Sequence, residues 1–239
     1  SQEVIETFLN GSDPERFIVG IEYDYRKNKI YKIIQHPERG KIVLEDTFTP
    51  FLWAGDLSGF NFYNGSKELQ KKKMGQYGIL STKLETMGND RLEAGLKYLV
   101  KSTNGYQSLL AFFKDGGIDP WGEDFKSQFQ ILSPAEQYLV QKKKRLFKGI
   151  EDYSEVHRLV FDIETTGLEP EKCKIILIGI KDNRGYTKTL DAFGDDGEKK
   201  SIEDFFRIIG EIKPTIIGGY NSASFDFPFI LKRAEILGI

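Results

Sequence analysis

Two acidic residues, Asp162 and Glu164, end an apolar segment in the stretch LVFDIETTGLEP (159–170). If this segment is a strand, side chains at alternate positions point to the same face, so the two carboxylates lie side by side. Like charges at that spacing repel one another unless a cation lies between them. Divalent cations such as Mg²⁺ and Mn²⁺ prefer oxygen ligands, and the spacing therefore predicts a metal site. The alternative is that both acids only face solvent, as isolated acids at strand ends commonly do.

A third acid, Asp226, lies in the stretch GGYNSASFDFPFILKRAEILGI (218–239). It precedes a predicted helix that has Pro228 within its first turn. Taken alone, Asp226 is most simply interpreted as the N-cap of that helix. If it lies at the edge of the same sheet as Asp162 and Glu164, it adds a third carboxylate to the predicted metal site.

The elements that must position these acids alternate between strand and helix. The apolar run of Leu159, Val160 and Phe161 is typical of a strand covered on both faces. Ser201 with Asp204 predicts the start of a helix. We expect strands at 159–164, 174–181, 185–191 and 215–219, and helices at 201–212 and 226–238. This order predicts an open sheet with helices packed on it.

The region before residue 150 predicts a separate domain that mixes strands and helices. Three β-branched and aromatic runs predict strands of a mostly antiparallel sheet, at 17–25, 29–35 and 41–48. Leucines at helical spacing predict a helix at 91–101, with Asp90 as its cap. A helix at 106–114 is expected to end at Gly116 and Gly117, and a capping box of Ser133 and Glu136 predicts another helix that runs through residue 145. The fold class is therefore α/β (α+β overall), with domains at 1–150 and 151–239.

Composition limits the possible functions. The chain has 239 residues with a net charge of −2, which argues against a protein that holds nucleic acid through overall positive charge. Its single cysteine, Cys173, forms no internal disulfide and fits packing in a reducing compartment. The sequence shows neither a long apolar run nor a secretion signal, so an intracellular protein without membrane association is expected. Because the chain begins with Ser1 and its last residues still read as helix, we expect a piece of a longer protein.

Several segments could contact nucleic acid. Lysine-rich runs at 71–73 and 142–145 could touch phosphates, although a solvated surface is the simpler interpretation. Four aromatic residues of the N-terminal region could stack on bases, but core packing is favoured for most of them: Phe17, Phe60, Phe62 and Tyr63.

The segments DIETTG and YNSASFDFP, some sixty positions apart, resemble the first two motifs of the DEDD superfamily of 3′–5′ exonucleases, which has an RNase H-like fold. With the approach segment YSEVHRLVFDIETTGLEP, the tail FILKRAEILGI and a mixed domain upstream, the chain resembles the N-terminal region of a family B DNA polymerase. The resemblance is strong over residues 134–239 and weaker upstream. It implies a mixed α+β N-terminal domain followed by a truncated RNase H-like exonuclease domain with a mixed sheet.

The resemblance also implies roles for individual residues. Asp162 would bridge two Mg²⁺ or Mn²⁺ ions, Glu164 would bind the ion that activates water, and Asp226 would help to hold the other ion. These three are the catalytic and metal-binding residues that we expect. Residues expected to contact nucleic acid are Thr165, Thr166, Leu168, Asn221 and Phe225. The implied partners are the primer 3′ end and template single strand of DNA, together with the rest of the polymerase chain.

The resemblance implies a parent protein that replicates or repairs DNA and proofreads by hydrolysing the primer end. The superfamily has a third motif, which carries the fourth acid, and it is not found before Ile239. We therefore expect the chain itself to bind metal weakly and to hydrolyse DNA poorly. Two alternatives stay open: a non-catalytic nucleic-acid-binding module, in which the acids serve structure, and part of a stand-alone exonuclease of the same superfamily.

Overall fold

The computed structural model describes residues 11–84 and 95–239. The chain divides into two compact units, Ser1–Ile33 with Val43–Lys148 and Ile34–Ile42 with Gly149–Ile239. None of the helices within the described ranges combines the length and the apolar character that a membrane span requires.

The described residues before 150 form two sheets. The three predicted apolar runs form β1 (Ile18–Asp24), β2 (Lys29–His36) and β3 (Gly40–Asp46), which lie in the order β1-β2-β3. A second sheet has the order β5-β6-β4-β7, and its neighbouring strands pair antiparallel. Its strands are β4 (Phe51–Gly55), β5 (Ile79–Lys83), β6 (Leu96–Ser102) and β7 (Phe129–Gln130).

Among residues 11–84 and 95–150, the α-helices are α2 (Lys67–Tyr77), α3 (Tyr106–Asp115) and α4 (Pro134–Lys142). The predicted capping box begins α4, where the Ser133 hydroxyl accepts from the Glu136 N–H at 3.3 Å and the Glu136 carboxylate accepts from the Ser133 N–H at 2.8 Å. Helix α3 ends at Gly116, as predicted, whereas α4 ends at Lys142 and not at the predicted residue 145, because Lys143 has a left-handed backbone at φ 55°. Helix α2 was not predicted; it buries none of its residues, so it lacks the apolar periodicity that identifies a helix in a sequence.

The helix predicted at 91–101 is wrong where the structure describes it. Residues 96–102 form β6, which pairs with β4 on one side and β5 on the other. Residues 91–94 and the predicted cap Asp90 lie outside the described residues. The stretch LKYLVKS contains Tyr98 and Val100, which favour strands, and pairing with two neighbouring strands decides in favour of the strand.

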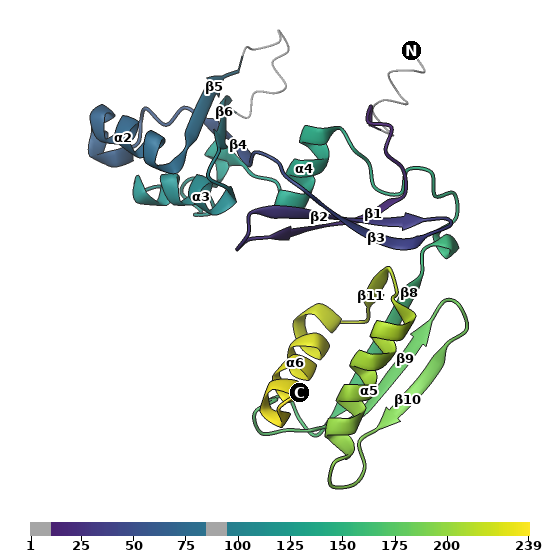
Figure 1. The fold of residues 1–239 in the computed structure, drawn as a ribbon. Coiled ribbons are helices and arrows are strands. Elements are labelled where there is room, and N and C mark those ends of the chain that lie inside the picture. The colour runs from purple at the N-terminus through teal and green to yellow at the C-terminus, as the bar shows by residue number, and fades with distance from the viewer. Residues whose placement is uncertain (1–10, 85–94) are drawn as a thin grey trace. The chain divides into compact units, whose positions relative to one another are not determined.

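The second unit contains one four-stranded mixed sheet in the order β10-β9-β8-β11. Strand β8 (Arg158–Thr165) pairs antiparallel with β9 (Ile175–Asp182) and parallel with β11 (Ile216–Gly218), and β10 (Thr187–Asp191) lies at the other edge. Helices α5 (Gly197–Ile212) and α6 (Phe227–Leu237) pack on one face of the sheet (Figure 1). The predicted α/β class, with a mixed α+β region followed by an RNase H-like sheet and packed helices, is confirmed.

One face of this sheet is open within the unit, which corrects the prediction of a strand covered on both faces. Along β8, buried Leu159, Phe161 and Ile163 alternate with exposed residues, and Val160 is 50% exposed. The buried set packs against helix residues that recur at helical spacing, Ile202, Phe205 and Ile208 of α5 and Phe229, Ile230 and Ala234 of α6. The alternation therefore produces one core face and one open face.

The predicted start of α5 is also wrong. The helix begins at Gly197, four residues before Ser201, and the Ser201 hydroxyl donates to the Asp191 carbonyl at 2.8 Å. A buried serine that bonds to an adjacent segment resembles a cap in the sequence. The described residues also contain short 3₁₀-helical turns at Phe62–Gly65, Lys126–Gln128 and Tyr153–Glu155, and a π-helical turn at Ser222–Asp226.

Candidate active site

Strand β8 places Asp162 and Glu164 on the open face of the sheet. Both side chains are exposed, and they alternate with the buried core residues Phe161 and Ile163. The pairing with β9 shifts register between Glu164 and Thr165. Such a bulge bends a strand and redirects the side chains that follow, and bulges are frequent next to active sites. The sheet thus presents two neighbouring carboxylates where the strand leaves its regular pairing.

Glycines leave space beside Asp162. In the β8–β9 register Asp162 lies opposite Gly179, and a Cβ placed on Gly179 would meet no heavy atom within 4 Å. Gly218 on β11 lies opposite Val160 and is equally unobstructed. A shallow depression covers this area, and residues from all four strands or their ends line it, among them Val160, Asp162, Lys181, Thr187, Thr189 and Tyr220. The open face can therefore admit a ligand next to Asp162.

The double glycine after β11 brings the next segment close to β8. A Cβ on Gly219 would lie 2.3 Å from the Phe161 carbonyl oxygen, so only glycine allows this approach. The turn that follows is anchored by the Asn221 carbonyl, which accepts from the N–H groups of Ser224 and Phe225. It leads through the π-helical turn to Asp226, and it leaves Tyr220 95% exposed at the edge of the depression.

Asp226 is buried and does not cap α6. The residue is only 3% exposed, its side chain makes no capping hydrogen bond, and its backbone is already helical at φ −63° and ψ −49°. Within the described residues, the Asp226 Oδ2 atom is buried and has no hydrogen-bond partner. A buried carboxylate oxygen without a partner is costly, and it needs an explanation other than helix capping.

Electrostatics link Asp226 to Asp162. Burial raises the pKa of Asp226, and the nearby charge of Asp162 raises it further. A bound divalent cation would relieve both effects, because it would give the Oδ2 atom a ligand bond and would neutralise the repulsion between the two carboxylates. This donor set, an orphaned buried oxygen beside a second carboxylate on an open face, fits a hard divalent cation.

The structure does not gather all three acids into one cluster. Across residues 11–84 and 95–239, no group of three or more His, Cys, Asp or Glu side chains lies close enough together to hold one metal ion. Asp162 and Asp226 interact, whereas Glu164 lies two positions along β8 on the same face. Two of the three predicted ligands are therefore adjacent, and Glu164 would complete the set only after its side chain reoriented.

The threonines of the DIETTG segment are used by the turn after β8. The Thr165 hydroxyl donates to the Gly167 carbonyl at 2.8 Å. The Thr166 N–H donates to the Lys174 carbonyl, and its hydroxyl accepts from the Lys174 N–H, both at 2.9 Å. Leu168 is 80% exposed beyond this turn. Of these three predicted contact residues, Leu168 is thus the one whose side chain is available to a ligand.

The two remaining predicted contact residues have structural partners as well. Asn221 adopts a left-handed backbone at φ 60°, and its side-chain oxygen accepts from the Ser224 hydroxyl at 2.7 Å. Phe225 packs partly against the core, with its ring 5.5 Å from that of Phe229. Both residues shape the turn that carries Asp226.

A buried ion pair fixes the position of α6 and the turn after β8. The Arg233 guanidinium of α6 makes two hydrogen bonds to Glu198 of α5, at 2.6 and 2.8 Å, and a third to the Pro170 carbonyl at 3.0 Å. Glu198 also accepts from the Ile175 N–H at 2.8 Å. Both side chains are less than a tenth exposed. The pair therefore connects α5 with α6, and it also binds β9 at Ile175 and the loop after β8 at Pro170.

Two exposed residues near the candidate metal ligands were not predicted from the sequence. Tyr220 follows the double glycine. Lys181 lies on β9 opposite Val160 of β8, two residues after Gly179 and on the same face of the sheet. Lys181 makes no salt bridge to any residue in the described part of the chain. Its alternation with buried Ile180 and Asp182 was the signal that places its side chain on the open face.

Comparison with known proteins supports an RNase H-like fold for the second unit. Residues 159–238 match the family model described as the RNase H superfamily. This range contains both sequence segments with the candidate ligands.

Named relatives are DNA polymerases. The chain is 40% identical over 102 residues to a DNA polymerase of Archaeoglobus fulgidus, covering 41% of this chain and 12% of that protein. It is 35% identical over 120 residues to a DNA polymerase of Pyrococcus glycovorans, covering 44% of this chain and 14% of that protein. The aligned region therefore spans only a small part of each relative.

A solved structure matches nearly the whole chain. The family B DNA polymerase from Pyrobaculum calidifontis aligns with a TM-score of 0.60 at 15% identity, covering 93% of this chain and 32% of that one. At this identity the match establishes the fold, and it extends that fold similarity to the region before residue 150.

Proposed function

The chain is similar in sequence and fold to the N-terminal region of family B DNA polymerases, and we propose that it is part of a polymerase whose residues 151–239 belong to a proofreading 3′–5′ exonuclease domain. Residues 1–150 would be the N-terminal domain, with a role in contacting template single strand. The names of the relatives support the polymerase, and the RNase H-like match supports nuclease chemistry. An intracellular location with access to DNA follows from this proposal.

One observation carries the exonuclease proposal: the buried Asp226 Oδ2 atom without a partner, beside the exposed Asp162. An acid that served only the fold would cap the helix or pair with a cation, and Asp226 does neither within the described residues. Asp162, Asp226 and Glu164 would hold two Mg²⁺ or Mn²⁺ ions. When bound, such ions lower the pKa of water and stabilise the oxygen that leaves in a phosphoryl transfer.

The chain's own residues would orient the DNA end. The space beside Gly179 and Gly218 would accept the terminal nucleotide next to Asp162. Exposed Leu168 would pack against the base, and Lys181 would contact a phosphate on the open face. The hydrogen bonds of Thr165, Thr166 and Asn221 would hold the two turns that carry these groups, with Phe225 anchoring the second turn in the core.

A second function is favoured by one observation. The described residues contain no cluster of three acids, and this observation favours a nucleic-acid-binding module without catalysis. The other alternative is part of a stand-alone exonuclease of the same superfamily, whose fourth acid lies in another part of that protein. The module would bind single-stranded DNA equally well with and without divalent cations.

The experiment that tests the proposal is hydrolysis of a 3′-labelled single-stranded oligonucleotide by the polypeptide that contains this region, with Mg²⁺ present. We expect release of nucleoside monophosphates and a loss of at least about a hundredfold in rate on Asp162→Ala, with DNA synthesis retained. Hydrolysis unchanged by Asp162→Ala would refute the assignment.

A further inference from the structure

Strand β3 is an open edge of the three-stranded sheet β1-β2-β3. At the opposite edge, β1 bonds to the segment after α4, because the Phe17 N–H donates to the Lys148 carbonyl at 2.8 Å and the Phe147 N–H donates to the Ile18 carbonyl at 2.7 Å. Within the described residues, no backbone group of Gly40–Asp46 makes a hydrogen bond outside its own sheet. An edge strand turns a row of N–H and C=O groups outward, so β3 can pair with one more strand.

The centre of β3 is apolar and exposed. Val43 is 53% exposed, and Leu44 beside it is exposed as well. Edge strands of natural proteins are commonly very short, or they carry charges or proline that discourage pairing with another chain. Strand β3 is seven residues long, and its charges lie on either side of the apolar centre, at Lys41 and Glu45. The centre of the strand therefore has no feature that prevents pairing.

The sequence of β3, GKIVLED, is complementary to itself. In an antiparallel pair of two copies centred on Val43, Lys41 lies opposite Glu45 of the other copy. Ile42 lies opposite Leu44 in the same register, and all seven residues of each strand are paired. A slip of two residues in either direction would place a charged side chain opposite Val43. Because opposite charges and apolar pairs stabilise antiparallel strands, the residues of β3 favour this single register.

From this complementarity we propose that β3 is the interface between two copies of this chain, paired antiparallel about a twofold axis at Val43. The two three-stranded sheets would join into one sheet of six strands. Backbone hydrogen bonds would supply most of the affinity, and the opposing side chains would set the register. A twofold interface uses the same surface on both copies, so the assembly closes as a dimer.

Both charged residues can reach the second copy without giving up their present contacts. Glu45 forms an ion pair with Lys29, and both side chains are largely exposed. The Lys41 ammonium donates to the Pro214 carbonyl at 2.8 Å, which uses one of its three N–H groups. A carboxylate accepts more than one hydrogen bond, so the Lys41–Glu45 contact between copies adds to these pairs.

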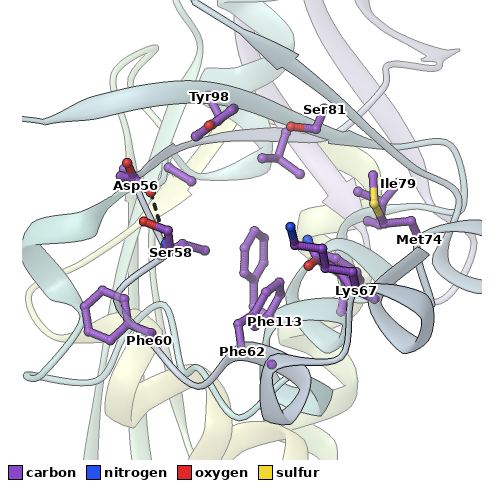
Figure 2. A pocket seen from close by; sticks show the side chains of 17 residues that line it. Asp56, Ser58, Phe60, Phe62, Lys67, Met74, Ile79, Ser81, Tyr98 and Phe113 are labelled. Atoms are coloured by element: carbon purple, nitrogen blue, oxygen red, sulfur yellow. Dashed lines mark hydrogen bonds between the residues drawn. The ribbon is translucent and has the colours of Figure 1, made fainter. Parts of the chain in front are cut away.

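The proposal goes beyond the exonuclease assignment and does not depend on it. None of the candidate metal ligands lies on β3. The residues that line the cavity between β4, β5, β6, α2 and α3 do not belong to β3 either (Figure 2). Substitutions on β3 should therefore leave metal binding unchanged, so that one claim can fail while the other stands.

Sedimentation velocity of the polypeptide that contains this region tests the proposal. The edge of one strand is a small interface, so we expect a reversible dimer with a Kd on the order of 100 μM. Val43→Lys should weaken association at least tenfold, because residue 43 lies opposite its own copy and the two charges would repel. Val140→Lys on α4 is the matched control, since Val140 is 55% exposed and does not lie on β3. A monomer at every concentration, or equal weakening by both variants, would overturn the proposal.

Charge exchange tests the register. Lys41→Glu places carboxylates opposite one another, and Glu45→Lys places ammonium groups opposite one another, so each variant alone should associate at least tenfold more weakly. An equimolar mixture of the two variants should recover association as a heterodimer, because every opposing pair again joins opposite charges. A mixture that stays monomeric would overturn the proposal.

The control for this exchange makes the same charge changes outside β3. Lys72→Glu and Glu203→Lys alter exposed residues of α2 and α5, and they should associate like the unsubstituted chain, both alone and mixed. Recovery of association in the β3 mixture and no change in the control mixture are the expected results. Thermal melts confirm that each variant is folded.

Discussion

Asp162 on β8 lies directly opposite Gly179 on β9, and no heavy atom of the described chain would lie within 4 Å of a Cβ on that glycine. An exposed carboxylate thus has open space at its side within a regular sheet. Internal packing does not require glycine at this position, and glycine weakens a strand interior. The space is consistent with the approach of a ligand to Asp162.

Gly179→Val should therefore impair ligand binding without harming the fold. Valine suits a strand, and its side chain would project into the space beside Asp162. We expect single-stranded DNA to bind at least about fivefold more weakly, measured by fluorescence anisotropy with Ca²⁺ in place of a catalytic metal, since Ca²⁺ also prefers oxygen ligands. The melting temperature should not fall. Gly210→Ala, at an exposed position of α5, is the control and should not change the DNA affinity. Unchanged DNA affinity in Gly179→Val would show that DNA does not occupy the space beside Asp162.

Asp226→Asn should stabilise the protein at neutral pH. Burial and the charge of Asp162 raise the pKa of Asp226 above its ordinary value, so ionisation of Asp226 costs more in the folded state than in the unfolded state. Full stability is present below the ordinary pKa of an aspartate and is lost as the pH rises through the raised value. Removing the charge should therefore increase the free energy of unfolding by on the order of 1 kcal/mol at pH 7 and leave it unchanged near pH 3.

Denaturant unfolding at several pH values measures this effect. The gap between Asp226→Asn and the unsubstituted chain should widen from pH 3 to pH 7. A divalent cation should stabilise the unsubstituted chain and not the variant. A variant that is less stable than the unsubstituted chain at pH 7 would mean that the Asp226 carboxylate serves the fold.

Breaking the Arg233–Glu198 pair should destabilise the second unit strongly. Arg233→Met leaves the buried Glu198 charge without its guanidinium and frees the Pro170 carbonyl, and such losses cost about 3–5 kcal/mol. The matched control is Arg207→Met, because Arg207 pairs with Asp204 and Glu211 on the exposed side of α5 and such pairs contribute less than about 1 kcal/mol. Comparable losses of unfolding free energy in the two variants would contradict this account.

The His157–Asp182 contact predicts a loss of stability in acid. Burial alone would raise the pKa of Asp182, but hydrogen bonds from His157 at 2.7 Å and from the N–H groups of Tyr186 and Arg184 hold it below the ordinary value. A lowered pKa contributes stability that is present above the ordinary aspartate value and lost as the pH falls through the lowered one. Asp182→Asn should reduce the unfolding free energy at pH 7, and this difference should close as the pH falls below the lowered pKa of Asp182. A constant difference across pH would show that the contact acts through packing alone.

The sequence predicted local features better than long-range ones. The capping box at Ser133 and Glu136 depends on residues three apart, and it formed as expected. The alternation of side chains in a strand correctly placed Asp162 and Glu164 on one face of β8. The apolar run of Leu159, Val160 and Phe161 wrongly suggested a strand covered on both faces, because Val160 is exposed. Strand β6 was misassigned as helix because Leu96 and Leu99 are three residues apart, a helical spacing, whereas pairing with β4 and β5, which is long-range, makes the segment a strand.

The properties of Asp226 could not be predicted from the sequence. Its position before Pro228 favours a helix cap. In the structure Asp226 is the last residue of a π-helical turn, and it has a helical backbone and a buried side chain. The turn that carries Asp226 follows Gly219, which approaches the Phe161 carbonyl, a contact between segments some sixty residues apart. The space beside Gly179 and the exposure of Lys181 likewise depend on which residues of β8 and β9 lie opposite one another, and this pairing joins segments that are distant in the sequence.

Manganese binding tests the central claim most directly. Calorimetric titration of the chain with Mn²⁺ at neutral pH should show binding that weakens at least tenfold in Asp162→Asn and in Asp226→Asn. Glu203→Gln, which changes an exposed acid on α5, should leave it unchanged. Binding that is absent from the unsubstituted chain, or that is equal in all four proteins, would contradict a metal site formed by Asp162 and Asp226.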